Sequence, residues 1–177
     1  MNATSTAASE LAACDFVQHI DTLAAILHDC WAHGASIGFV APFTPADAAQ
    51  FWRKLQPAFD SGARRLFVAR DAGGAIVGTV HLSLDMPPNG AHRAEINKML
   101  VHSAARQQGH ARALMLAAET CARTLGKSLL VLDTLSGGVA ERLYAGLGFQ
   151  MTGQIPRYAS LDDGTLHATS VMYKPLS

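Results

Sequence analysis

Three ionisable side chains lie where the sequence pattern indicates central strands and a helix that follows them: Glu95, Asp133 and Tyr144. Glu95 falls on residues 94–101, whose alternating pattern predicts a strand, and Asp133 ends the apolar run 128–133. Such a run is typical of a strand buried on both faces. A carboxylate can accept a proton, and a phenol with a pKa near 10 can donate one. These residue types therefore suit acid–base chemistry near the middle of a sheet.

A second feature with chemical potential is the turn that connects the predicted strand 94–101 to the next helix. The first turn of a helix has free N–H groups and a positive dipole end, which together suit a phosphate. Here Gly109 and Ala111 are small enough to let a pyrophosphate approach the backbone, and Arg106 and Arg112 add positive charge. Taken alone, the turn is more typical of an ordinary loop that contains a glycine.

Each of the three ionisable residues also has a structural interpretation. Glu95 can form a salt bridge with Arg93 or Lys98, Asp133 can cap the turn that follows it, and Tyr144 can pack in the core. However, burying a carboxylate is costly unless it is paired, and two carboxylates on central strands therefore favour function.

Several common functional motifs are absent. Gly126-Lys127-Ser128 ends like a P-loop, but the required glycine five residues earlier is Cys121. There is no HExxH or GxSxG sequence, and the histidines show no metal-ligand spacing. The three cysteines, Cys14, Cys30 and Cys121, include no CxxC pair, so we expect neither a zinc site nor a disulfide framework. No metal is expected, and free thiols suit the cytoplasm.

Composition excludes other classes of protein. The chain has 177 residues, 49% of them hydrophobic, which suits one domain over 1–177. It has 14 basic and 14 acidic residues, and such a balance does not favour nucleic-acid binding. No stretch approaches the roughly 20 apolar residues that span a membrane. Residues 1–10 lack the features of a secretory signal, and we expect residues 1–12 to be a mobile tail.

Periodicity predicts an α/β protein with a mixed (α+β) sheet. Three strands with short connections should be antiparallel neighbours, whereas a strand–helix–strand unit should make one parallel pair. Alternation should place Glu95, Asn97, Met99 and Val101 on one face of their strand. The expected helices are 14–32, 44–60, 107–125 and 139–147, and the expected strands are 65–70, 75–85, 94–101, 128–133, 149–155 and 166–173.

Two motifs together resemble those of the GNAT superfamily of acyl-CoA-dependent N-acetyltransferases. Arg106-x-x-Gly109-x-Ala111 is similar to the family's pyrophosphate loop, and Tyr144-x-x-x-Gly148-Phe149 is similar to a later family motif. By element order the resemblance covers residues 65–174. It implies a mostly antiparallel central sheet, flanked by about four helices, whose parallel pair splays at the cofactor site. It also implies acetyl-CoA as co-substrate, and it allows a homodimer.

The resemblance also implies roles for individual residues. Tyr144 would protonate the leaving thiolate, and Glu95 would take the proton of the amine. Asp133 is a second candidate for that proton, because it also lies on a predicted central strand. The N–H of Met99 or Leu100 would hold the thioester carbonyl, and transfer would be direct, with no covalent enzyme intermediate. The expected cofactor contacts are Met99, Leu100, Val101, Arg106, Gln107, Gln108, Gly109, His110, Ala111 and Arg112.

Five short segments resemble the tabtoxin-resistance acetyltransferases, which act on a β-lactam amino acid: 34–39, 88–90, 93–95, 132–134 and 166–167. This resemblance implies a small amine as acceptor, such as an amino acid or a toxin-like amino compound, and suggests a role in toxin or antibiotic resistance. Small loop changes alter the acceptor, so the toxin itself is not carried over. Acetylation of a protein N-terminus or lysine and a non-catalytic acyl-CoA sensor remain alternatives. The expected acceptor contacts are Ser36, Phe39, Asn89 and Tyr158.

Overall fold

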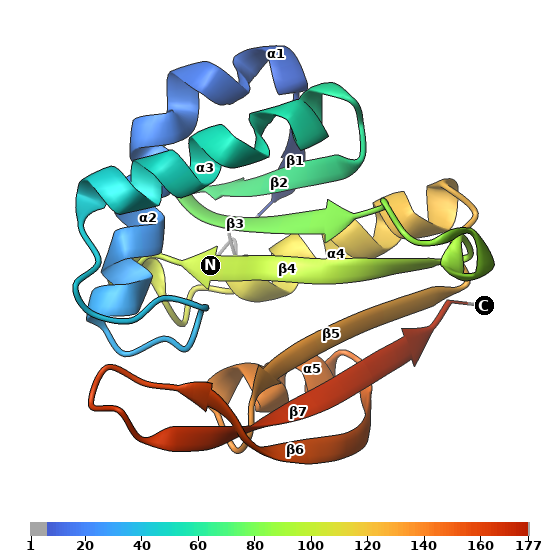
Figure 1. The fold of residues 1–177 in the computed structure, drawn as a ribbon. Coiled ribbons are helices and arrows are strands. Elements are labelled where there is room, and N and C mark those ends of the chain that lie inside the picture. The colour runs from blue at the N-terminus through green and yellow to red at the C-terminus, as the bar shows by residue number, and fades with distance from the viewer. Residues whose placement is uncertain (1–6, 177) are drawn as a thin grey trace, which may run out of the picture.

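The structure, a computed structural model, describes residues 7–176. Within that range seven strands form one sheet in the order β1-β2-β3-β4-β5-β7-β6, and helices cover both of its faces (Figure 1). The elements in chain order are β1 (Ala8–Leu11), α1 (Ala13–Phe16), α2 (Ile20–Ala32), α3 (Pro45–Asp60), β2 (Arg64–Arg70), β3 (Ile76–Ser83), β4 (Arg93–Val101), α4 (His110–Thr124), β5 (Leu129–Leu135), α5 (Val139–Gly146), β6 (Gln150–Ser160) and β7 (Leu166–Pro175).

The pairing directions confirm the predicted mixed sheet. β2, β3 and β4 are antiparallel neighbours, whereas β4 and β5 are parallel and are linked through α4. β5 pairs antiparallel with β7, and β7 pairs antiparallel with β6. In the described chain one parallel pair therefore lies in an otherwise antiparallel sheet, because the α4 crossover returns the chain in the same direction.

Each face of the sheet has its own apolar layer. On one face α3 begins with a capping box, in which the Asp47 N–H donates to Thr44 Oγ1 and the Thr44 N–H donates to the Asp47 carboxylate. Trp52 of this helix is fully buried. On the other face Leu114 and Ala118 of α4 pack against the sheet. Burial of these side chains holds the helices to the sheet. No helix in the described range is long and apolar enough to cross a membrane.

The N-terminal segment differs from the expected tail over residues 1–12. Residues 8–11 form β1, which pairs with β2 from Ala8 opposite Ala69 to Leu11 opposite Leu66. A strand this short shows no clear alternation, so its pairing depends on the exposed edge of β2. Residues 1–6 of the expected tail lie outside the described residues.

A β-bulge at Lys98 interrupts the regular pleat of β4. The register pairs His81 with Asn97 but Thr79 with Leu100, so β4 contains one extra residue between these pairs. Lys98 has a positive φ of 47°, and its carbonyl accepts a hydrogen bond from the Thr79 hydroxyl at 3.2 Å. An extra residue on one strand reverses the alternation of the side chains that follow it.

The bulge makes the expected shared face of β4 wrong. Glu95 and Asn97 face the α2–α3 side, because the apolar residues that alternate with them pack toward α4. Beyond the bulge, Met99 and Val101 pack toward α4 instead, and Leu100 joins the core beneath α2 and α3. The face of β4 that carries Glu95 and Asn97 before the bulge is therefore continued by Leu100 after it, and not by Met99 and Val101.

Candidate active site

The parallel strands β4 and β5 separate partway along their length. Their pairing runs from Arg93 with Leu129 to Glu95 with Val131 and ends there. β4 nevertheless continues to Val101, and β5 stays paired with β7 as far as Leu135. In Figure 1 β4 stays beside β1–β3, whereas β5 stays beside β6 and β7, and the two groups of strands diverge from each other. The sheet is therefore split at the position that the resemblance implies for a cofactor.

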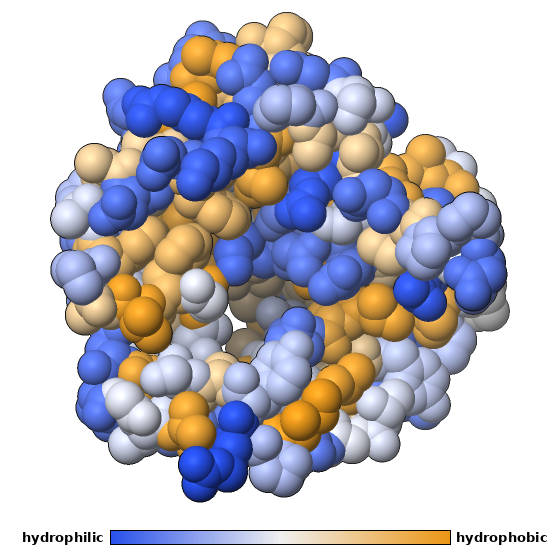
Figure 2. All heavy atoms as spheres, in the orientation of Figure 1, coloured by the Kyte–Doolittle hydropathy of each residue, from blue (hydrophilic) through white to orange (hydrophobic). Residues whose placement is uncertain are grey.

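Two cavities lie at this separation, and Met99 and Ala140 line both of them. The first, called the central cavity below, has a volume of about 280 Å³. Its walls include loop residues 36–38, residues 96–99 of β4 and residues 133–135 of β5. Figure 2 shows a hollow near the middle of this face, with hydrophilic residues along part of its rim.

The second cavity, called the helix-start groove, has a volume of about 570 Å³ and follows the beginning of α4. Nine of the ten predicted cofactor residues line it, and the tenth, Gln108, does not. The Gln108 side chain instead donates to the Ala104 carbonyl at 3.4 Å. The nine are Met99, Leu100, Val101, Arg106, Gln107, Gly109, His110, Ala111 and Arg112.

The backbone at the start of α4 presents free N–H groups. Gln107 and Gly109 have positive φ values of 62° and 85°, and α4 begins at His110. The Ala113 N–H donates to the Gly109 carbonyl at 3.0 Å, which is the first i to i−4 hydrogen bond of the helix, so the N–H groups of residues 110–112 have no such acceptor within it. Both ring nitrogens of His110 are buried with no hydrogen-bond partner in the described structure, so this residue offers the groove its backbone. The arrangement suits an anion.

α2 holds the turn that leads into α4. The Asp29 carboxylate accepts hydrogen bonds from the Ser103 N–H at 2.7 Å and the Ser103 hydroxyl at 2.8 Å. Burial would raise the pKa of Asp29, but these hydrogen bonds outweigh it and lower the pKa. Cys30 lines the groove and donates to the Val101 carbonyl at 3.4 Å. Because burial raises the pKa of its thiol, Cys30 is a poor nucleophile.

Tyr144 combines packing with access to the central cavity. It is only 6% exposed, and its ring packs near Phe149, with centroids 5.9 Å apart. It also lines the central cavity, and its hydroxyl has no hydrogen-bond partner among the described residues. Burial, assisted by the charge of Asp133, raises the pKa of Tyr144. The phenol therefore stays protonated and can serve as a proton donor.

Asp133 and Lys98 place opposite charges on the wall of the central cavity. The Asp133 side chain is exposed and makes no hydrogen bond within the described range, so it does not cap the following turn, in which Gly138 donates to the Leu135 carbonyl. Lys98 is partly buried, and its ammonium donates to the Ile37 carbonyl at 2.6 Å. Burial lowers the pKa of Lys98, and the charge of Asp133 opposes that shift.

Glu95 does not line the central cavity, but it contacts Asn97, which does. Its carboxylate accepts a hydrogen bond from the Asn97 side-chain amide at 3.0 Å, and Asn97 accepts one from the Ser83 hydroxyl at 2.6 Å. The ion pairs among the described residues do not include Glu95, so the salt bridge with Arg93 or Lys98 does not form. Asn97 lines the cavity and thus connects Glu95 to it.

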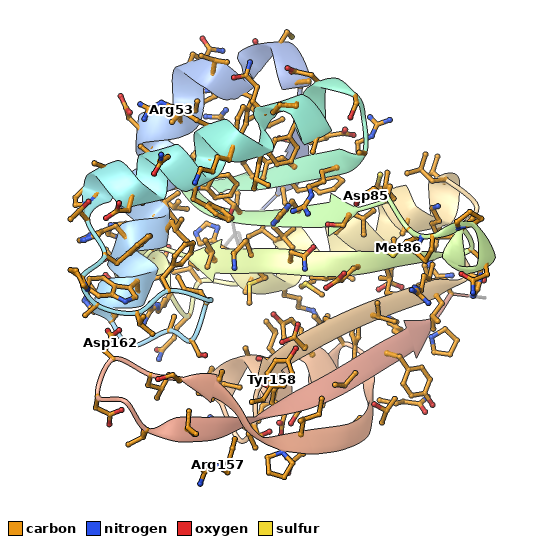
Figure 3. All side chains as sticks on the ribbon, in the orientation of Figure 1. Arg53, Asp85, Met86, Arg157, Tyr158 and Asp162 are labelled. Atoms are coloured by element: carbon orange, nitrogen blue, oxygen red, sulfur yellow. The ribbon has the colours of Figure 1, made fainter. Side chains whose placement is uncertain are left out.

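Two loops meet beside the central cavity. The Asp162 carboxylate, in the β6–β7 turn, accepts hydrogen bonds from the Ala41 N–H at 2.8 Å and the Trp31 indole N–H at 3.3 Å. Ser36, in the loop after α2, and Tyr158, near the end of β6, both line the cavity. Figure 3 shows Tyr158 near the middle of the molecule and Asp162 at the tip of the turn. β6 extends to Ser160, beyond the predicted end at 155, through a register shift that includes Tyr158.

Two of the expected acceptor contacts lie elsewhere. Phe39 stacks on Phe43, with centroids 4.2 Å apart, and is not part of the central cavity. Asn89 lies in the turn 88–90 before β4, at the end of the strand that remains paired with β5. Figure 3 shows Asp85 and Met86 of the same connection far from Tyr158. The β3–β4 connection lies at the opposite end of β4 from the separation, so Asn89 does not line the central cavity.

The sequence pattern alone does not place Lys98 or Asn97 in the site. Lys98 interrupts an apolar strand pattern between Asn97 and Met99-Leu100, which is a signal that a charged residue has a specific partner. Without the bulge, however, nothing in the pattern says which way its side chain points. Among the described residues no group of three or more His, Cys, Asp or Glu side chains is placed to hold a metal ion.

Comparisons with known proteins agree on one family. The family model described as "Acetyltransferase (GNAT) family" matches residues 21–149. N-acetyltransferase 8B of Rattus norvegicus is 38% identical over 90 residues, which cover 50% of this chain and 40% of the relative. Probable N-acetyltransferase family 8 member 5 of Mus musculus is 35% identical over 118 residues, which cover 66% of this chain and 50% of the relative. The chain thus spans half or less of the length of these relatives.

Solved structures share the whole fold at low sequence identity. A ribosomal-protein-alanine N-acetyltransferase from Brucella melitensis has a TM-score of 0.77 at 20% identity, covering 96% of this chain and 99% of that one. A phosphinothricin acetyltransferase from Sinorhizobium meliloti, in complex with AcCoA, has a TM-score of 0.78 at 18% identity. The match covers 98% of this chain and 90% of that one. At these identities the likeness establishes the fold.

Proposed function

The chain belongs to the acetyltransferase (GNAT) family, and on this premise we propose that it transfers the acetyl group of acetyl-CoA to the amine of a small molecule. One observation carries the proposal. The helix-start groove and the central cavity share Met99 and Ala140 at the point where β4 and β5 separate. A thioester entering from the groove and an amine entering from the central cavity would meet there.

The helix-start groove has the chemistry that a nucleotide thioester requires. The free N–H groups before Ala113 and the charges of Arg106 and Arg112 suit a pyrophosphate. The apolar side chains of Val139 and Leu143 line the same groove and suit the pantetheine arm. The Sinorhizobium meliloti neighbour was solved with AcCoA, which supports this choice of ligand. Acetyl-CoA supplies an activated acetyl group when bound, and the remaining chemistry falls to the chain's own residues.

Tyr144 is our candidate for the acid. A departing thiolate has a conjugate thiol with a pKa near 8.5, so a phenol can protonate it. The raised pKa of Tyr144 keeps its proton in place, and its hydroxyl is not engaged by another described side chain. Transfer is direct, because the buried, protonated Cys30 is a poor candidate for a covalent intermediate.

Asp133 is our candidate for the group that receives and orients the amine. It is exposed on the wall of the central cavity, and its charge favours an incoming ammonium. Glu95 acts through Asn97 and supports the same wall. Beyond Glu95, β4 has no strand partner on the side of β5, so the N–H of Met99 or Leu100 is our candidate to hold the thioester carbonyl.

The size of the central cavity favours a small acceptor. About 280 Å³ suits a molecule the size of an amino acid, and Asp162 joins the two loops beside it. The resemblance to tabtoxin-resistance acetyltransferases points the same way, toward amino acids or β-lactam amino compounds. The solved neighbours are named for different acceptors and do not decide between a protein and a small molecule.

A turnover experiment tests the proposal. Release of CoA is followed with a thiol reagent while acetyl-CoA is offered with free amino acids, simple amines, and peptides with free N-termini or lysines. We expect turnover with amino acids and little with peptides. Turnover with peptides alone would favour protein acetylation, and tight acetyl-CoA binding without any turnover would favour a sensor.

A further inference from the structure

Lys98 is a charged residue of the central cavity to which the proposed mechanism assigns no role. The bulge in β4 gives it a positive φ of 47° and directs its side chain toward loop 36–38. There its ammonium donates to the Ile37 carbonyl and lies 5.4 Å from the Phe39 ring centroid and 5.5 Å from that of Phe51. Two aromatic faces and a carbonyl favour the charged form of the amine.

This partly buried ammonium has no counter-charge within ion-pair distance among the described residues. The ion pairs among the described residues do not include Lys98, and Asp133 attracts it only from a greater distance. Buried charges are normally paired, because removing a charge from water is costly. An ammonium has three N–H donors, and the Ile37 carbonyl accepts from one of them. The remaining donors can bind an anion that enters the central cavity.

We propose that Lys98 binds an acidic group of the acceptor, so that the preferred acceptors are amines that also carry a carboxylate or a similar anion. Asp133 and Lys98 line the same small cavity with opposite charges, and a zwitterion would match both. The amine would lie toward Asp133 and Tyr144, and the acid toward Lys98 and Ile37. This inference rests on the proposed function, since it names the acceptor class of that site.

Matched acceptors test the proposal. L-alanine, L-serine, L-methionine and L-lysine are each compared with their amides, which keep the α-amine but lose the carboxylate. The variant Lys98→Gln can still donate to the Ile37 carbonyl but has no charge, and Lys98→Arg keeps the charge. Lys127→Gln is the control, because Lys127 also donates to a backbone carbonyl, that of Ala91 at 2.7 Å, and lines neither cavity.

We expect the wild-type protein to prefer the acids. Lys98→Gln should lower kcat/KM for the best acid about 10- to 100-fold, the usual worth of a charged hydrogen bond, and should change the matched amide much less. Lys98→Arg should keep part of the preference, and Lys127→Gln should keep all of it. Equal turnover of acids and amides by the wild type would overturn the proposal, as would an equal loss for both in Lys98→Gln, which would indicate a structural role.

Calorimetry separates this inference from the proposed function. The same acids and amides are titrated into the protein saturated with CoA, and acetyl-CoA affinity and Tm are measured for each variant. If acids bind better than amides and the difference is lost in Lys98→Gln, Lys98 recognises the acid even where no amine is acetylated. If acids and amides bind alike, the inference fails whatever the turnover. Should Lys98→Gln not fold, the comparison in the wild type and Lys98→Arg decides.

Discussion

Glu95 and Val131 form the last residue pair of the parallel β4–β5 ladder, and two residues beyond them Asn97 and Asp133 line opposite walls of the central cavity. The end of one ladder thus creates the space and supplies polar groups to both sides of it. Side chains two residues apart on a strand share a face, so Glu95 and Asn97 can interact, and they do so through a hydrogen bond.

Tyr144→Phe should remove the acid and keep the packing. The phenylalanine ring can make the same contact with Phe149, so Tm and acetyl-CoA affinity should change little. Steady-state kinetics should show kcat lowered about 100-fold, the scale of a positioned acid. Because burial raises the pKa of Tyr144, its ionisation should not limit the wild-type rate on the alkaline side up to pH 10. A variant with wild-type kcat would leave Tyr144 as a packing residue.

Asp133→Asn preserves the shape of the cavity wall and removes its charge. It should lower kcat/KM for the amine at least about 10-fold, because the carboxylate attracts and orients the ammonium, while acetyl-CoA affinity stays near the wild-type value. Glu95→Gln is the comparison, since Glu95 reaches the cavity only through Asn97. If Glu95→Gln alone abolished turnover, the base would be Glu95, and Asp133 would have a supporting role.

Gly109→Ala should weaken acetyl-CoA binding. Gly109 has a φ of 85°, which an alanine adopts at a cost of about 1 kcal/mol or more, and the turn would then shift its N–H groups. Gly74→Ala is a matched control, because Gly74 has the same φ of 85° but lies in the β2–β3 turn, away from both cavities. Both variants should lose similar stability, and only Gly109→Ala should raise the Kd for acetyl-CoA in calorimetry. An equal Kd in both would contradict the pyrophosphate assignment.

His81→Phe should make the protein less sensitive to acid. Burial, with Arg64 and Lys98 nearby, lowers the pKa of His81 from 6.5 to about 3. Above pH 6.5 the ring is neutral whether folded or unfolded. Between pH 6.5 and pH 3 only the unfolded chain takes up the proton. The free energy of unfolding therefore falls by about 1.4 kcal/mol for each pH unit by which the solution is acidified.

Phenylalanine can occupy the same place between Trp52 and Phe59 without binding a proton. Urea unfolding at pH 7 and pH 4.5 should therefore show a smaller loss of stability at low pH for His81→Phe than for the wild type. Parallel losses in the two proteins would show that His81 does not account for the acid sensitivity.

Much of the fold could be predicted because its signals are local. The turn at Gly109, the apolar run of β5 and the capping box at Thr44 all depend on residues close together in the chain. The parallel β4–β5 pair also follows from local signals, since a helix between two strands requires a crossover. The same holds for Asp133 and Tyr144. Local pattern places Asp133 at the end of the predicted strand 128–133 and Tyr144 on the next helix, and both residues line the central cavity.

The sequence by itself determined the order of the elements from α2 onward and the helix start that presents free N–H groups, and its local pattern placed Asp133 and Tyr144 on consecutive elements. Only the tertiary structure decided that Lys98 joins the cavity, that Asn97 stands between Glu95 and the cavity, that β1 forms, and that Asn89 lies at the far end of the sheet. These features depend on strand register and on contacts between residues far apart in the chain. A one-residue bulge reverses every side chain beyond it, and the alternating pattern of β4 does not by itself mark where the bulge lies.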